Sequence, residues 1–177
     1  MSQTTLDIKE PGLNVLPPGV ERHVVNAGGL TGLQIFPDDE IEIINEEGNQ
    51  ICEIICFDKD GKSELGILNQ KENCKKSFIK ELLKSKDESS LITNLQLKKR
   101  NLDINKSKSS ILFDEQTPSG EKIKIKSKDK CYVIFAAPQN NMLVSDQNPS
   151  IDLTLFIKRY KIVNDKELSI IPDPIYE

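Results

Sequence analysis

Residues 30–57 read LTGLQIFPDDEIEIINEEGNQICEIICF, and the fold class is predicted chiefly from this segment. Short apolar runs are separated in it by turn-forming residues at 37–39 and again at 46–49. Runs of about 4 to 8 residues rich in isoleucine and other β-formers, bounded by such turns, are typical of strands. We therefore predict strands at 30–36, 40–45 and 50–57, the last two forming a hairpin.

The strand predicted at 50–57 is apolar on both faces apart from Glu53. A strand that alternates apolar and polar residues has one face in water, whereas one that is apolar on both faces lies between two layers. We therefore expect this strand to occupy the middle of a two-layer structure and to be the most buried.

The rest of the chain shows the same strand pattern with one helical interruption. Further strands are predicted at 23–25, 110–113, 122–126, 131–137 and 151–163. Apolar residues at helical spacing predict one helix near 73–85, capped by Asn73. In residues 84–110 the apolar residues follow neither a helical nor a strand-like spacing consistently. The predicted fold is mainly β, an antiparallel sandwich or open barrel of short strands with one inserted α-helix.

The 177 residues suit one compact domain. Proline and glycine predict an extended N-terminal arm over residues 1–20, followed by a single β-rich domain over 21–168. Residues 169–177 alternate prolines with apolar residues and are predicted to be a connector. We expect the chain to be a fragment, or a subunit that abuts a further domain.

Composition limits the classes of partner. The 24 Lys+Arg against 28 Asp+Glu give a net charge of −4, which does not indicate nucleic acid or an anionic membrane. The sequence has no transmembrane-length apolar run and no secretory start, so we predict a cytoplasmic protein with reduced cysteines. The expected partners are further domains of the same polypeptide or a subunit, and a homo-oligomer is compatible with the sequence.

Candidate metal and catalytic residues are isolated from one another in the sequence. His23 has no H-x-x-H, H-x-E or C-x-x-C spacing around it, which favours a structural role. Cys52 and Cys56 would lie about 13 Å apart along a strand, too far to share one zinc ion. Asp58 to Gly61 resembles a calcium loop, but its glycine is misplaced and a turn is expected. No catalytic or metal-binding residue is therefore predicted.

The sharpest charge pattern is a series of lysines on alternate positions. Its members are Lys122, Lys124, Lys126, Lys128 and Lys130. In an extended segment these side chains line one face, and they would form a candidate anion strip for a phosphate, a polyglutamylated cofactor or an acidic partner. The alternative, which we favour, is an edge strand protected from aggregation by lysine, or a solvated face.

Residues 17–61 resemble the N-terminal portion of the urea carboxylase-associated family. The resemblance rests on the hairpin pattern P-x-D-x-I-x-I-I-x-x-x-G-x-Q, which starts at Pro37 and runs through Asp39 to Gln50, and on the apolar strand that ends at Phe57 and Asp58. A weaker match covers Tyr132 to Met142. Such β-modules occur at the N-terminus of trimethylamine-oxide demethylase and aminomethyltransferase-like enzymes, ahead of a glycine-cleavage T-protein domain that binds tetrahydrofolate.

The resemblance implies a function outside direct catalysis. The segment between the two matches lacks the family's His- and Cys-containing motif, so no zinc ligand is carried over. We expect an accessory, non-catalytic module of a tetrahydrofolate-dependent aminomethyltransferase or amine-oxide demethylase, with no cofactor of its own. The alternatives are a stand-alone metal-dependent enzyme and an anion-binding domain. The metal enzyme would use His23, Cys52 or Cys131 with Asp39 or Asp58.

Overall fold

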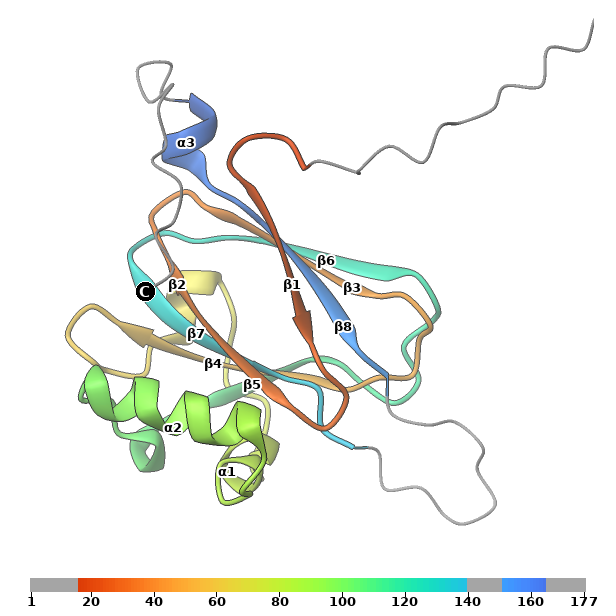
Figure 1. Ribbon diagram of the computed structural model, residues 1–177, viewed down its shortest axis with the longest axis vertical. Coiled ribbons are helices and arrows are strands. Elements are labelled where there is room, and N and C mark those ends of the chain that lie inside the picture. Colours follow the sequence, from red (N-terminus) through yellow and green to blue (C-terminus); the bar gives the residue numbers. More distant parts are fainter. Residues whose placement is uncertain (1–15, 140–150, 165–177) are drawn as a thin grey trace, which may run out of the picture.

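The computed structural model describes residues 16–139 and 151–164, and a strand is present in each predicted stretch (Figure 1). The strand predicted at 151–163 is too long, because it ends at Lys158 and Tyr160–Asn164 form a helix. The strands are β1 (Val20–Val25), β2 (Leu30–Ile35), β3 (Glu40–Asn45), β4 (Cys52–Asp58), β5 (Ser109–Phe113), β6 (Glu121–Lys126), β7 (Cys131–Ala136) and β8 (Leu153–Lys158). The prediction of a mainly β, antiparallel sandwich is confirmed.

The strands form two four-stranded sheets that pack face to face. The first sheet has the order β1-β8-β3-β6 and the second has the order β2-β7-β4-β5. Every pairing is antiparallel, and β1 pairs with β8, β2 with β7, β3 with β6 and β4 with β5. This nested pairing, in which the first strand joins the last, is the topology of a jelly roll.

The predicted hairpin of residues 40–45 and 50–57 is wrong. β3 pairs with β6 and β8 in the first sheet, whereas β4 pairs with β5 and β7 in the second. The connection between them crosses from one sheet to the other, and Gly48 turns it with a φ of +80°. The buried Asn45 side chain donates to the Gln50 carbonyl at 2.8 Å and holds the two sides of the crossing together.

The predicted burial of the fourth strand is confirmed. β4 lies between β7 and β5, and its residues from Cys52 to Phe57 are all buried. Cys52, Ile54 and Cys56 join the core between the sheets, while Ile55 and Phe57 face a second apolar cluster outside the sandwich. β4 is apolar on both faces because the second sheet is covered on both sides.

Two α-helices provide this outer cover, where one helix was predicted (Figure 1). They are α1 (Phe78–Leu82) and α2 (Glu88–Lys99). Ser77, and not Asn73, caps α1. Asn73 instead exchanges side-chain hydrogen bonds with Ile111 on the edge strand β5, which satisfies backbone groups that would otherwise be unpaired.

Three short elements complete the described chain: the 3₁₀ helices η1 (Leu65–Leu68) and η2 (Ile104–Lys106), and the helix α3 (Tyr160–Asn164). Most of the predicted arm over 1–20, and the whole predicted connector over 169–177, lie outside the described residues. Within the described part, no helix has the length and apolar character needed to span a membrane.

Candidate functional site

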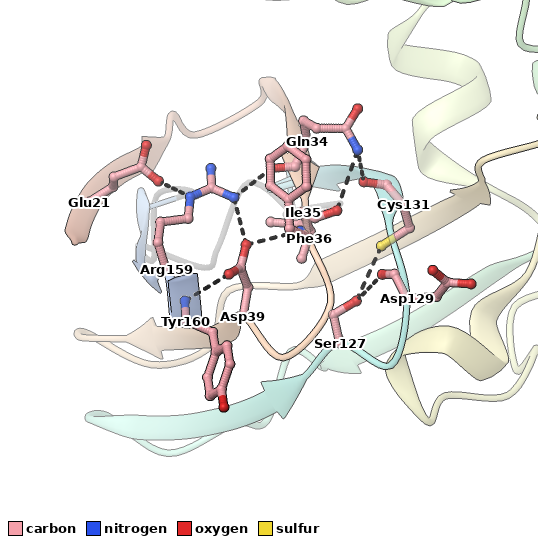
Figure 2. Close-up of polar contacts among 10 residues, drawn as sticks. All are labelled: Glu21, Gln34, Ile35, Phe36, Asp39, Ser127, Asp129, Cys131, Arg159 and Tyr160. Carbon is pink, nitrogen blue, oxygen red and sulfur yellow. Dashed lines mark hydrogen bonds and ion pairs between the residues drawn. The ribbon is translucent and has the colours of Figure 1, made fainter. Parts of the chain in front are cut away.

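A cluster of charged side chains lies at the end of the sandwich where α3 begins (Figure 2). Arg159 follows the last residue of β8, and Asp39 precedes the first residue of β3. Because β3 and β8 are antiparallel neighbours, with Glu40 opposite Lys158, these two flanking residues meet at the same sheet end. Glu21 on β1, the other neighbour of β8, completes the cluster.

The Asp39 carboxylate is 2% exposed, and both of its oxygens accept hydrogen bonds. Oδ2 accepts from the Phe36 backbone N–H at 2.9 Å and from Arg159 Nη1 at 2.9 Å. Oδ1 accepts from the Tyr160 N–H at 3.0 Å. Asp39 therefore closes the turn between β2 and β3 and anchors the start of α3.

Arg159 is held by partners from three parts of the chain. Its Nε donates to Glu21, and its Nη1 donates to the Gln34 carbonyl at 2.8 Å as well as to Asp39. Burial disfavours the guanidinium charge, but the hydrogen bonds and charges of Glu21 and Asp39 outweigh it and raise the pKa of Arg159. A guanidinium held in this way is a fixed charge that does not supply protons.

A cavity of about 540 Å³ lies beside the cluster. Its lining includes Phe36, Lys161 and Ile162 in addition to the three charged residues. The Phe36 ring is 40% exposed and lies 5.9 Å from the Arg159 guanidinium carbon. Arg159 bonds to one carboxylate oxygen of Glu21 and to one of Asp39, so the cavity wall offers an exposed aromatic ring beside an ion-pair network with one more negative than positive charge.

Three of the four cysteines, Cys52, Cys56 and Cys131, lie in the core, whereas Cys74 is partly exposed. Cys56 and Cys131 come from the neighbouring strands β4 and β7 and are hydrogen-bonded to each other, and this bond together with burial raises the pKa of the Cys56 thiol. Burial also raises the pKa of Cys52. Ser127 Oγ lies 3.6 Å from the Cys131 sulfur (Figure 2). Raised pKa values make the Cys52 and Cys56 thiols poor nucleophiles and metal ligands at neutral pH. The pKa of Cys131 is instead lowered, chiefly by its hydrogen bond with Cys56, although burial opposes the shift.

Of the residues in the predicted metal-enzyme alternative, Cys131 and Asp58 lie opposite each other in the β4–β7 pairing, but His23 is not brought to them. His23 is on β1 in the first sheet, whereas Cys52 and Cys131 are on β4 and β7 in the second. The Nε2 atom of His23 is buried and has no hydrogen-bond partner. Among residues 16–139 and 151–164, no three His, Cys, Asp or Glu side chains are placed to hold one metal ion. Asp58 accepts from the backbone of Asp60 and Lys62 and so organises a turn.

The lysine series divides into two parts. Lys122, Lys124 and Lys126 are exposed on β6, which is an edge strand, while Lys128 and Lys130 follow in the turn after the strand ends at residue 126. Lys124 lies 3.6 Å from Glu42, and Lys126 lies 3.8 Å from Asp38. Acidic residues on β3 and in the preceding turn thus offset part of the positive charge.

Glu53 is the residue whose role the sequence did not reveal. It is fully buried on β4, and its carboxylate accepts from the Ser77 hydroxyl at 2.6 Å and from the Phe78 N–H at 2.7 Å. A third bond comes from the Ile79 N–H at 3.2 Å. Glu53 therefore caps α1 from the sheet. Its sequence signal was a single carboxylate in an otherwise apolar strand.

Comparison with known proteins identifies a larger relative. No protein-family model matches the chain. The chain is 33% identical over 168 residues to the trimethylamine-oxide aldolase of Ruegeria pomeroyi. The match covers 95% of this chain but only 21% of that protein.

The predicted relation to an enzyme that converts trimethylamine oxide is thereby confirmed, but only for a part of such an enzyme. The resemblance to the urea carboxylase-associated family stays a prediction. The chain is related to about one fifth of a larger enzyme.

Proposed function

We propose that this chain is an accessory, non-catalytic β-module of a larger amine-oxide demethylase or aminomethyltransferase-like enzyme. The observation that carries the proposal is the match to 21% of a trimethylamine-oxide aldolase. The remaining four fifths of such a protein would supply the reaction and would bind tetrahydrofolate. The module would contribute to assembly or shape the route of the substrate.

The charged cluster supports this assignment. A catalytic acid or base needs a carboxyl group that can exchange a proton with substrate, usually near neutral pH. Both Asp39 oxygens are occupied by donors from the protein, and Arg159 balances the charge. This arrangement fixes β1, β3, β8 and α3 relative to one another, which is what a rigid module requires.

The test is the activity of the isolated chain. Purified protein is incubated with trimethylamine oxide, with Zn²⁺, Fe²⁺ and tetrahydrofolate supplied, and formaldehyde is measured. The Ruegeria enzyme serves as positive control, and the heat-unfolded chain as negative control. We expect no formaldehyde above the negative control. Clear turnover by the isolated chain would contradict the non-catalytic assignment.

The metal-dependent alternative makes a separate prediction. If the chain bound a catalytic metal through Cys131, the purified protein would contain near-stoichiometric zinc, and Cys131→Ser would lose it. Metal analysis of the wild-type chain and of Cys131→Ser therefore distinguishes a metal-dependent enzyme from a non-catalytic module. Anion binding by the lysine series is tested by replacing Lys124 and Lys126 with Gln, which should abolish any salt-sensitive capture of phosphate or polyglutamate.

A further inference from the structure

The helix α2 is packed in an unusual way for the surface of a domain. Its buried residues are Ser90, Thr93 and Leu97, two of them small and polar. Ser90 donates to the Leu82 carbonyl at 2.7 Å, and Thr93 donates to the Ser89 carbonyl at 2.7 Å, so their hydroxyls are satisfied inside. A surface helix normally buries its apolar residues and exposes its polar ones.

Three of the four apolar side chains of α2 face outward instead, and only Leu97 is buried. Leu91, Ile92 and Leu95 are 53%, 52% and 66% exposed. They account for three of the five large apolar side chains that are exposed in the described part of the chain. No other described element covers this side of α2, which lies on the outside of the second sheet (Figure 1). A concentration of exposed apolar surface of this kind marks an interaction site.

A charge borders the apolar residues at each end. Glu88 precedes Leu91 by three residues, and Lys99 follows Leu95 by four. At about 100° per residue, all five side chains fall within a sector of about 100° and form one stripe along the helix. Among the described residues, neither Glu88 nor Lys99 forms an ion pair.

We propose that this stripe, formed by Glu88, Leu91, Ile92, Leu95 and Lys99, is the contact surface for a second copy of the chain. Two α2 helices would pack antiparallel about a two-fold axis that passes between Thr93 and Asn94. Ile92 then lies opposite Leu95 of the second copy, and Glu88 lies opposite the second copy's Lys99. Both pairings occur twice, because a two-fold interface uses the same surface on each copy.

The order of the charges along the stripe, with Glu88 at its start and Lys99 at its end, is the reason for choosing a second copy as the partner. A stripe that is acidic at its start and basic at its end is complementary to itself only when the two helices run in opposite directions. A contact made through one helix of 12 residues should bury less than the about 800 Å² per partner of a standard interface, so we expect a dissociation constant in the micromolar range or weaker. The inference stands apart from the proposed function, because it depends only on α2.

The first test is sedimentation of the full chain at concentrations from micromolar to about 1 mM. We expect a monomer–dimer equilibrium, and we expect Leu95→Ser to raise the dissociation constant about 10-fold or more. Leu95 is exposed, so the variant should fold normally by circular dichroism. A wild-type chain that stays monomeric throughout, or an association that Leu95→Ser leaves unchanged, would overturn the proposal.

The second test uses charge reversal. E88K places lysine opposite Lys99, and K99E places glutamate opposite Glu88, so each variant alone should associate at least about 10-fold more weakly. In an equimolar mixture of the two variants, every charge pair is attractive again, and the mixture should form a heterodimer. The matched controls E115K and K128E change the charge equally on exposed residues away from α2. A mixture that associates no better than either variant alone would refute the antiparallel arrangement.

Discussion

Asp39 and Glu53 are both buried carboxylates that hold a helix against a sheet, but they do so by different means. Asp39 has a full positive charge beside it, the Arg159 guanidinium at 2.9 Å. The hydrogen bonds to Glu53 come from the Ser77 hydroxyl and from the backbone N–H groups at the start of α1. One carboxylate is therefore held by a counterion and the other by neutral donors.

The environment of Glu53 shows in its pKa. Burial raises the pKa of Glu53, and the hydrogen bonds from Ser77, Ser109 and the backbone, which lower it, do not fully compensate. For a buried ion pair, removal of one partner leaves an uncompensated charge. When a carboxylate is held by neutral donors, an amide in its place loses the charge but can still accept most of the same hydrogen bonds. The two sites should therefore respond differently to the same change from acid to amide.

The largest effect is expected for Asp39→Asn. The amide keeps the shape of the side chain but leaves Arg159 with Glu21 as its remaining acidic partner. We expect the free energy of unfolding to fall by about 3 to 4 kcal/mol, measured by urea denaturation. Glu21→Gln is the control, since Glu21 has a side chain 43% exposed and its loss should matter less. Equal losses for the two variants would show that burial of Asp39 is not the decisive factor.

Glu53→Ala should follow in size. Truncation leaves the buried N–H of Ile79 and the neighbouring N–H of Phe78 without their acceptor, which costs about 2 kcal/mol in the free energy of unfolding. Glu53→Gln keeps an acceptor for these groups and should cost about 1 kcal/mol or less. Urea denaturation of both variants measures the difference. If Glu53→Gln is as damaging as Asp39→Asn, the distinction between the two sites fails.

The pH dependence of stability sharpens the same contrast. Because the pKa of Glu53 is higher in the folded chain than its ordinary value of 4.5, the folded state binds the proton more tightly. The resulting contribution to stability is fully present below the unfolded pKa and is lost as pH rises through the folded pKa. The stability of the wild-type chain relative to Glu53→Gln should therefore fall as pH rises above about 4.5. Denaturation midpoints across this range measure it, and a relative stability that rises would contradict the assignment.

The smallest effect is expected for the exposed ion pairs of β6. Lys124 is 77% exposed in its pair with Glu42, so the pair is screened by solvent. Lys124→Gln should change the free energy of unfolding by less than about 0.5 kcal/mol. A loss comparable to that of Asp39→Asn would mean that exposed and buried ion pairs are not distinguished in this protein.

The strands were predictable from sequence because their signals are local. Apolar runs and turn residues lie next to each other in the chain, and each predicted run contains a strand, although the last third of 151–163 is helical. The assignment of strands to sheets was not predictable, as the failed hairpin of 40–45 and 50–57 shows. The strand that pairs with a given strand is determined by contacts between distant segments, which local patterns do not encode.

The charged cluster and the packing of α2 were not predictable for the same reason. Arg159 lies 120 residues from Asp39 and 138 from Glu21, so nothing near it in sequence marks it as a partner of either. In α2 Leu91, Ile92 and Leu95 are exposed, whereas Ser90 and Thr93 are buried together with Leu97. A search for an apolar stripe facing the core therefore fails there, even though the segment is helical.

The position of β8 between β1 and β3 affects how the chain folds during its synthesis on the ribosome. Val20 pairs with Lys158, so the first sheet closes only after nearly the whole domain has left the ribosome. Until then β1 and β3 each have an open edge, which is a template for pairing with another chain. Folding dominated by such distant contacts is slow. Nascent chains of this protein should therefore need protection by a chaperone during synthesis.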